Sequence, residues 1–144
     1  MSAEQNAALV HRYFEECVSG ASGPKQDRAL GILDELLTDD FVMFYNSDTD
    51  ADATRGRERH KEFLIEHAQA YPDDHWFIEA LVVDEENAAC QWRIQATHGR
   101  TGNPIDLRAA DFFQVREGRL AELRRFLDFA GLHRQTRRRS RSSR

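Results

Sequence analysis

The sequence has little cysteine, almost no lysine and no long hydrophobic run. Nothing in it approaches the ~18 uninterrupted apolar residues that a membrane-spanning helix needs. The N-terminal segment MSAEQNAALV has no basic stretch ahead of an apolar core, so it does not resemble an export signal. We therefore expect a cytoplasmic protein with no membrane partner.

The two cysteines, Cys17 and Cys90, fall in an expected helix and an expected strand. Without a secretory context they are better interpreted as small buried hydrophobic residues than as a disulfide. Two cysteines are also too few for a structural zinc cluster.

No other pattern in the sequence predicts a metal site. The acidic loop 47–54 resembles the start of a calcium loop, but Ala53 stands where the turn glycine belongs and Arg59 where the bidentate glutamate belongs. His60 and His67 lie seven apart on one helical face with no third ligand in view. We therefore expect no metal and no other cofactor.

Acidic residues outnumber basic ones, 25 to 20, for a net charge of −5. Six arginines lie within residues 134–144, so the rest of the chain is still more acidic. An acidic body argues against nucleic acid as a specific partner. The Arg/Ser segment 134–144 is expected to be a disordered, solubilising tail that could touch phosphate without sequence preference.

A chain of 144 residues has the length of one domain. Ser2 and Gln5 form a capping-box signal, and apolar residues at helical spacing predict a first helix over 3–19. A leucine-rich stretch predicts a second helix ending near Thr38. A third is expected over 57–70, because the chain then reaches Tyr71-Pro72 and pre-proline residues disfavour helix.

The strands follow a period of two. A short apolar strand is expected over 41–45, followed by strands near 76–83, 88–98, 105–115 and 120–129. Because short turns join the last four, they predict an antiparallel meander. The fold class is therefore α+β, with the helices packed on one face of a curved sheet.

Alternation along two of these strands predicts a pocket wall. Cys90, Trp92, Ile94 and Ala96 share an apolar face, which His98 continues to the rim. On the next strand, Ala109, Asp111, Phe113 and Val115 share a face. Asp111 is thus a carboxylate among apolar neighbours, which makes it a functional candidate.

The partner of Asp111 depends on how the last hairpin turns. A three-residue loop, Arg116-Glu117-Gly118, pairs Val115 with Arg119 and sets Leu123 opposite Asp111, with Arg125 on the diagonal. A two-residue Glu117-Gly118 turn places Arg124 opposite Asp111. We favour the three-residue loop, because it puts Ala121, Leu123 and Leu127 inward. An Asp111–Arg125 ion pair that only braces the sheet and a catalytic Asp111 are equally compatible with the pattern.

Several segments together resemble a known family. These are ALVHRYFEECV, LLTDDFV, Gly56 in RGRERHKEFL, ACQWRIQATH, ADFFQVREGRL and FLDFAGL. They resemble the SnoaL-like polyketide cyclases of the nuclear transport factor 2-like superfamily. The resemblance implies one domain over 1–133: a cone-shaped, curved antiparallel sheet with the three helices packed on its concave face.

The resemblance carries over unevenly to individual residues. In the cyclases proper, the acid/base aspartate falls on Arg125 and its histidine partner on Asp111. The epoxide-hydrolase triad falls on Ile94, Trp92 and Arg125, and none of these matches. The oxyanion-binding tyrosine and aspartic acid of the ketosteroid isomerases fall on Tyr13 and Asp111, which match. The proton-shuttling aspartate of the isomerases falls on Tyr45, a poor base at neutral pH.

These observations favour a cofactor-independent enzyme that enolises or cyclises a small apolar ketone-type metabolite. The expected catalytic residues are Asp111, Tyr13 and Arg125. The expected substrate-binding residues are Tyr45, Asn46, Trp76, Trp92, His98 and Phe113. The alternatives are a non-catalytic ligand-binding protein, and a dehydratase or hydrolase whose base would be His98 or Asp111.

The sequence also predicts a homodimer. Phe112 and Phe126 fall on the sheet face opposite the pocket, where two large exposed aromatic side chains are unexpected in a monomer.

Overall fold

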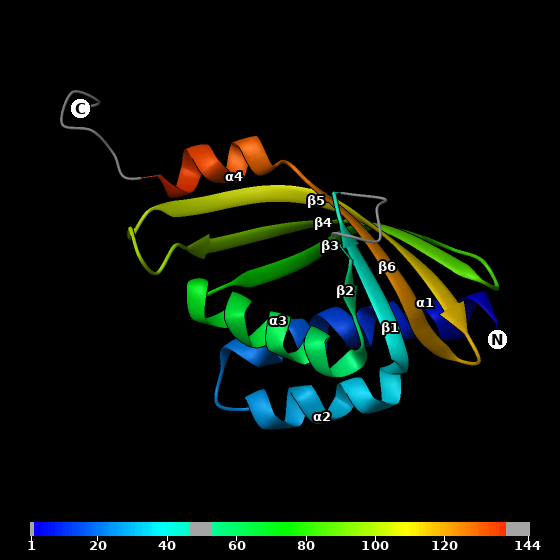
Figure 1. The fold of residues 1–144 in the computed structure, drawn as a ribbon. Helices are drawn as coiled ribbons and strands as arrows, with labels where there is room; N and C mark the ends of the chain where they lie inside the picture. The colour runs from blue at the N-terminus through cyan, green and yellow to red at the C-terminus, as the bar shows by residue number, and fades with distance from the viewer. Residues whose placement is uncertain (1, 47–52, 138–144) are drawn as a thin grey trace.

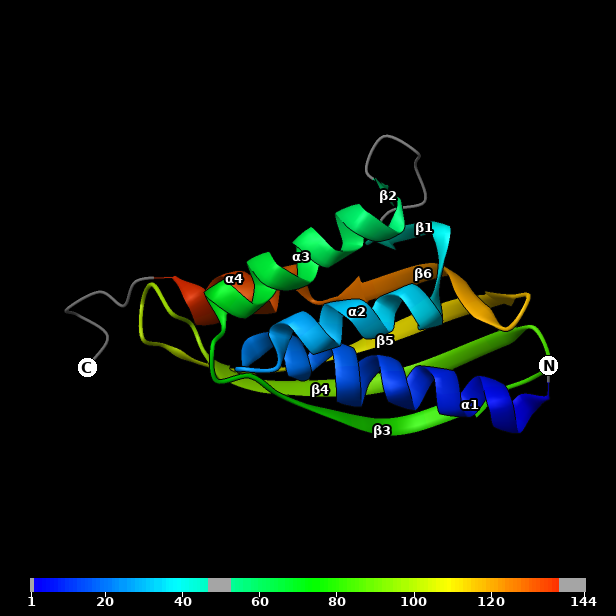
Figure 2. The ribbon, with the colours of Figure 1, turned by 90° about the horizontal axis from the view of Figure 1, so that it is seen from below.

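A six-stranded curved sheet and three helices on one of its faces form the body of the protein (Figures 1 and 2). The structure, a computed structural model, describes residues 2–46 and 53–137. The elements are α1 (Ala3–Arg12), η1 (Tyr13–Val18), η2 (Gly20–Ser22), α2 (Gln26–Leu36), β1 (Leu37–Tyr45), β2 (Thr54–Arg55), α3 (Arg57–Ala70), β3 (His75–Val83), β4 (Asn87–Thr97), β5 (Pro104–Arg116), β6 (Arg119–Leu127) and α4 (Phe129–Thr136). This arrangement confirms the expected α+β cone fold.

The strand order in the sheet is β2-β1-β6-β5-β4-β3. Strands β3 to β6 form the expected antiparallel meander, and β1 adds a parallel pair with β6. The register shifts at one point in each of the β1–β6, β3–β4 and β5–β6 pairs. Such bulges bend strands and increase twist, so they curl the sheet around the helices.

The helices begin and end where local chemistry favours it. Gln5 N–H donates to Ser2 Oγ, and Ser2 N–H donates to Gln5 Oε1, which completes the expected capping box of α1. Helix α3 spans the expected residues and stops before Tyr71-Pro72. Together α1, α2 and α3 lie across one face of the sheet, as Figure 2 shows.

The first helix changes its winding halfway along. Residues Tyr13 to Val18 form a π-helix, in which Ser19 N–H donates to the carbonyl of Phe14. The sequence predicted a continuous α-helix here. Inside this wider turn Tyr13, Phe14, Cys17 and Val18 are all buried. Such π-helical turns are frequent at functional sites.

The last hairpin differs from the expected register. Glu117 and Gly118 both have positive φ, at 51° and 77°, and form a two-residue turn with Arg116 opposite Arg119. A bulge follows, because Val115 pairs with Leu120 but Gln114 pairs with Glu122. The extra residue, Ala121, shifts the rest of β6 by one position. Asp111 therefore lies directly opposite Arg125, not opposite Leu123 as the three-residue loop required.

The chain beyond β6 forms a helix that the sequence analysis did not predict. Strand β6 stops at Leu127, and Asp128 caps α4 by accepting a hydrogen bond from Gly131 N–H at 2.8 Å. Helix α4 reaches Thr136, so it includes the start of the segment expected to be a tail. Residues 138–144 of that segment lie outside the described residues, as do Asp48, Asp50 and Asp52 of the acidic loop.

The core lies between the helices and the concave face of the sheet. Cys90, Trp92 and Ile94 are buried there as the alternation predicted, whereas Gln91 and Gln95 are exposed. Cys17 and Cys90 are both free and buried, which confirms that they form no disulfide. No helix in the described part of the chain is both long and apolar enough to cross a membrane.

Candidate functional site

A buried ion pair lies at the centre of the cone. Arg125 Nε and Nη2 donate to Asp111 Oδ1 and Oδ2, both at 2.9 Å. The two residues face each other across β5 and β6, and their side chains are 0% and 2% exposed. Burial alone would lower the pKa of the guanidinium, but the charge and hydrogen bonds of Asp111 hold it above its usual value. Arg125 is therefore a permanent positive charge inside the protein.

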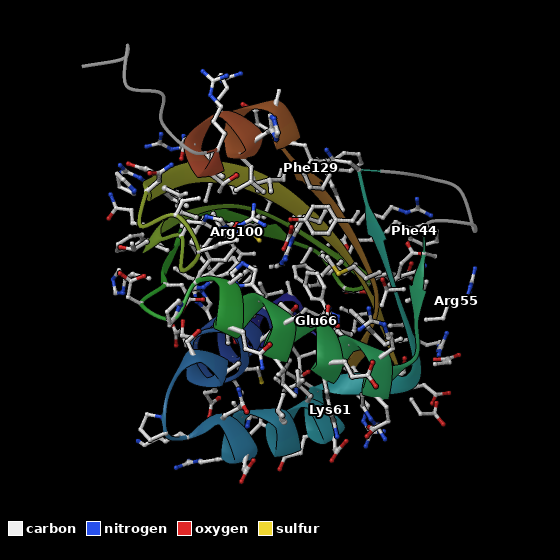
Figure 3. All side chains as sticks on the ribbon, turned by 60° about the vertical axis from the view of Figure 1, so that its left-hand side comes forward. Phe44, Arg55, Lys61, Glu66, Arg100 and Phe129 are labelled. Carbon is white, nitrogen blue, oxygen red and sulfur yellow. The ribbon has the colours of Figure 1, made fainter. Side chains whose placement is uncertain are left out.

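Aromatic rings surround this charge. The guanidinium carbon of Arg125 lies 4.8 Å from the centre of the Trp92 ring and 5.9 Å from those of Trp76 and Tyr45. These distances allow cation–π attraction. Trp92 is buried, whereas Tyr45 and Trp76 are half-buried and connect the charge with the surface. Figure 3 shows the side chains on the whole ribbon, with Lys61 and Glu66 labelled on α3 and Phe129 at the start of α4.

Tyr13 and His60 form a second polar group beside the ion pair. The Tyr13 hydroxyl lies 2.7 Å from His60 Nε2, and both residues are fully buried. Burial, followed by the positive charge of Arg125, lowers the His60 pKa to about 3, so the imidazole is neutral. Burial raises the Tyr13 pKa, while the positive charge of Arg125 acts in the opposite direction.

His60 is the residue of this centre that sequence analysis did not place in the site. It was weighed only as a metal ligand, because its partner Tyr13 is 47 positions away in the chain. Its spacing from Leu64 and Ala68 places it on the buried face of α3, and this spacing was the signal in the sequence that could have identified it. Among the described residues, no group of three or more potential ligands could hold a metal ion.

The structure brings most of the expected site residues together. Phe113 packs edge-on against Tyr13, with ring centres 5.7 Å apart, and so joins the cluster around Arg125. Asn46 does not join it, because its amide side chain is bound to the backbone of Leu127. Asn46 instead fixes the end of β1 to the end of β6.

His98 follows β4 directly and is half-buried. Its Nδ1 is 2.8 Å from Thr101 Oγ1, and its ring centre is 5.6 Å from that of Tyr71. Tyr71 in turn contacts His67, whose ring also lies against Trp76. The half-buried side chains of His98, Tyr71, His67 and Trp76 thus follow one another along the end of the cone at which α3 ends.

The fold agrees with the comparisons with known proteins. The model of the SnoaL-like domain family matches residues 9–123, so the chain belongs to that family. A solved protein from Jannaschia sp. CCS1, assigned as a SnoaL-like polyketide cyclase, has 23% sequence identity and a TM-score of 0.81, with 92% of each chain covered.

Two further solved structures show the same fold. A protein from Rhodopseudomonas palustris assigned as an isomerase has 23% identity and a TM-score of 0.72, with 88% of this chain and 94% of that one covered. TsrD from Streptomyces laurentii has 18% identity and a TM-score of 0.74, with 94% and 96% covered. No curated protein matches the chain. At these identities the similarity establishes the fold and leaves the reaction to the site itself.

Proposed function

We propose that this protein is a cofactor-independent enzyme that enolises or cyclises a small, mostly apolar ketone. The observation that carries the proposal is the buried Arg125 guanidinium, held by Asp111 at 2.9 Å and near enough to the Tyr13 hydroxyl for its charge to act on the Tyr13 pKa. A carbonyl oxygen bound beside them receives a hydrogen bond from Tyr13. As enolisation proceeds, negative charge grows on that oxygen and Arg125 stabilises it. Fixed donors in a site closed to water are well suited to this task.

Asp111 has a different role in this scheme from the one expected for a catalytic acid. Both of its oxygens accept hydrogen bonds from Arg125, so neither is free to exchange a proton with a substrate. In our proposal it is a positioning residue that holds the guanidinium in place and offsets its charge when no substrate is bound. Arg125 and Tyr13 then contact the substrate.

The surrounding residues support an apolar, flat substrate. Tyr45, Trp76, Trp92 and Phe113 present aromatic surface around the polar centre, and such surface favours rings and conjugated ketones. Tyr45 and Trp76 are half-buried, so we place the entry of the substrate beside them. Two of the solved relatives are assigned as a cyclase and an isomerase, and the reaction that we propose belongs to the same class.

The test uses 2-tetralone, a flat bicyclic ketone with exchangeable α-protons. NMR in deuterated buffer follows the loss of those protons with the wild-type protein and with Tyr13→Phe. We expect Tyr13→Phe to lower the exchange rate by about 10²-fold, the effect of removing one oxyanion donor. His75→Gln, an exposed change on β3, is the control and should exchange at the wild-type rate. Wild-type exchange no faster than buffer would refute the proposal.

One observation favours a second candidate, a non-catalytic ligand-binding protein. The carboxylate of Asp111 is fully bound, and burial makes the Tyr13 hydroxyl a weaker acid. A site whose central carboxylate is already bound suits binding as well as catalysis. Binding of 2-tetralone without any proton exchange would favour this candidate. The dehydratase and hydrolase alternatives gain no support, since Arg125 holds Asp111 and His98 lies beside Thr101.

A further inference from the structure

A second histidine of α3 lies on the same face as His60, seven positions along, where the helix approaches its end. Positions seven apart on an α-helix fall on one side, and His60 on this side is fully buried inside the cone. His67 is half-buried, with its side chain 20% exposed. Its ring centre lies 4.8 Å from that of Tyr71 and 5.1 Å from that of Trp76. His67 therefore lies on the helix face that buries His60, at a position that still reaches the surface.

A buried carboxylate stands beside His67. The Asp74 side chain is 1% exposed, and its Oδ2 lies 3.6 Å from His67 Nδ1. The same oxygen accepts a hydrogen bond from Trp76 Nε1 at 2.7 Å. Asp74 N–H donates to the carbonyl of Tyr71, which fixes the turn between α3 and β3. The turn thus directs one nitrogen of His67 toward Asp74 and leaves Nε2 as the nitrogen available to a ligand.

Trp76 joins this pair to the oxyanion site. Its ring contacts both groups, with its centre 5.1 Å from the His67 ring centre and 5.9 Å from the Arg125 guanidinium carbon. A flat ketone lying along this indole would have its oxygen near Arg125 and its α-carbon near His67. The two groups therefore contact one aromatic side chain, against which a flat ketone can lie.

Burial keeps His67 in the neutral form, which accepts a proton. Burial and, to a smaller extent, the positive charge of Arg125 lower its pKa to about 4, so the ring is neutral at pH 7. Burial also raises the pKa of Asp74. The other titratable groups on this side are Tyr71, at the end of α3, and His98, whose ring contacts Tyr71.

We propose that His67 is the general base of this site and that Asp74 is the residue that positions it, an inference that rests on the proposed function. His67 Nε2 removes a proton from the carbon next to the substrate carbonyl. The electrons of that C–H bond form a carbon–carbon double bond, and the carbonyl electrons move to the oxygen beside Tyr13 and Arg125. The imidazolium formed is stabilised by Asp74 and returns the proton to the substrate at the end of the turnover. No external oxidant or reductant is needed.

The first test measures 2-tetralone exchange by His67→Gln, with His75→Gln as the matched control. Loss of a general base lowers rates by about 10² to 10⁴-fold, so we expect at least a 10²-fold fall in kcat for His67→Gln and none for His75→Gln. Binding of 2-naphthol, an analogue of the enolate, should stay within about threefold, because the oxyanion site is intact. An exchange rate for His67→Gln within threefold of wild type would overturn the inference.

Asp74→Asn tests the positioning role. Asparagine can still accept the hydrogen bond from Trp76 but carries no charge to stabilise the imidazolium. We expect kcat to fall by about tenfold with little change in KM. For the wild type, kcat should fall only as the pH drops through about 4, where His67 becomes protonated. A wild-type kcat that halves near pH 6.5 would contradict the buried base proposed here.

NMR of the unmodified protein supplies a readout independent of activity and of folding of the variants. Long-range ¹H–¹⁵N correlations report which nitrogen of His67 carries the proton at pH 7. We expect the proton on Nδ1, toward Asp74; a proton on Nε2 would overturn the inference. The failures can be told apart. If the wild type does not exchange 2-tetralone, the proposed function fails and this inference with it, whereas exchange that survives in His67→Gln removes only the inference.

Discussion

At the scale of single residues, the dominant feature is a set of charges and neutral groups removed from water together. Asp111 and Arg125 satisfy each other, and His60 remains neutral beside Tyr13. The free-energy cost of burying two charges is several kcal/mol for each ion, and good hydrogen-bond geometry between the partners offsets it. Such a centre tolerates removal of both charges better than removal of one.

We predict that Asp111→Asn destabilises the protein by about 3 to 5 kcal/mol, because it leaves the buried guanidinium without its counter-charge. The double variant Asp111→Leu/Arg125→Met, which removes both charges, should cost less than the single change. Urea unfolding followed by circular dichroism measures both. A single variant within 1 kcal/mol of wild type would show that the pair contributes little.

The buried histidines also predict how stability depends on pH. His60 and His67 titrate at about 3 and 4 in the folded protein, against 6.5 for an ordinary histidine. The unfolded chain therefore binds more protons below about pH 6.5, so stability is full above that pH and falls as the pH drops toward 3. Urea midpoints between pH 7 and 4 should show this fall. It should be shallower in His60→Gln and unchanged in the exposed control His75→Gln.

At the scale of elements, the β5–β6 hairpin decides whether the site forms. Its two-residue turn places Glu117 and Gly118 at positive φ, and the bulge at Ala121 sets Arg125 opposite Asp111. Residues with a Cβ resist positive φ, so glycine at the second position keeps the turn short. A longer turn would change which residue of β6 faces Asp111.

Two glycine substitutions should have opposite effects. Gly118→Ala forces a Cβ into positive φ and should destabilise the protein by about 1 to 2 kcal/mol. Gly31→Ala lies on the exposed side of α2 with nothing within 4 Å of the added carbon, and should stabilise by roughly 0.5 to 1 kcal/mol. Thermal unfolding of both proteins measures the contrast. Shifts of the same sign would contradict the turn geometry described for Gly118.

The elements differ in how well the sequence predicts them, for physical reasons. Helix α3 was predicted to the residue, because Gly56 and Pro72 mark its ends. The bulge at Ala121 and the π-turn at Tyr13 leave the apolar pattern almost unchanged, so periodicity does not reveal them. Helix α4 was missed because FLDFAGL continues the apolar residues of β6. Strand β2 has two residues and exists only through pairing with β1.

The features of the candidate site also differ in how well the sequence predicts them. Alternation placed Asp111, Phe113 and Trp92 inward correctly, since it needs only local spacing. The contact of His60 with Tyr13 and the pairing of Asp111 with Arg125 join different elements, and their geometry depends on packing and on the bulge. No local pattern encodes such geometry.

At the scale of the whole molecule, the outer face of the sheet carries exposed aromatic side chains. Phe112 and Phe126 pack edge-on there, with ring centres 6.0 Å apart, and are 50% and 46% exposed. The same face also carries, farther along the strands, charged residues already paired with each other, such as Arg93 with Asp106. Apolar rings together with paired charges are the composition of a protein interface.

We predict that this face forms a homodimer. Sedimentation should give twice the 16.7 kDa mass of the chain at micromolar concentration, and Phe112→Glu should shift the protein toward the monomer. Phe129→Glu is the control, because Phe129 is also 46% exposed but lies on α4. A wild-type monomer at 100 micromolar would refute the dimer.

The parallel pairing of β1 with β6 has a consequence for synthesis on the ribosome. Tyr45 and its neighbours on β1 pair with Arg125 and its neighbours on β6, near the other end of the chain. Until β6 leaves the exit tunnel, the growing chain exposes the apolar edge of β1 and lacks the cation that completes its interior. Contacts between such distant segments slow folding, because the intervening chain must first be ordered. The nascent N-terminal half therefore cannot complete its core alone, and the buried Asp111–Arg125 pair is assembled only when β6 emerges.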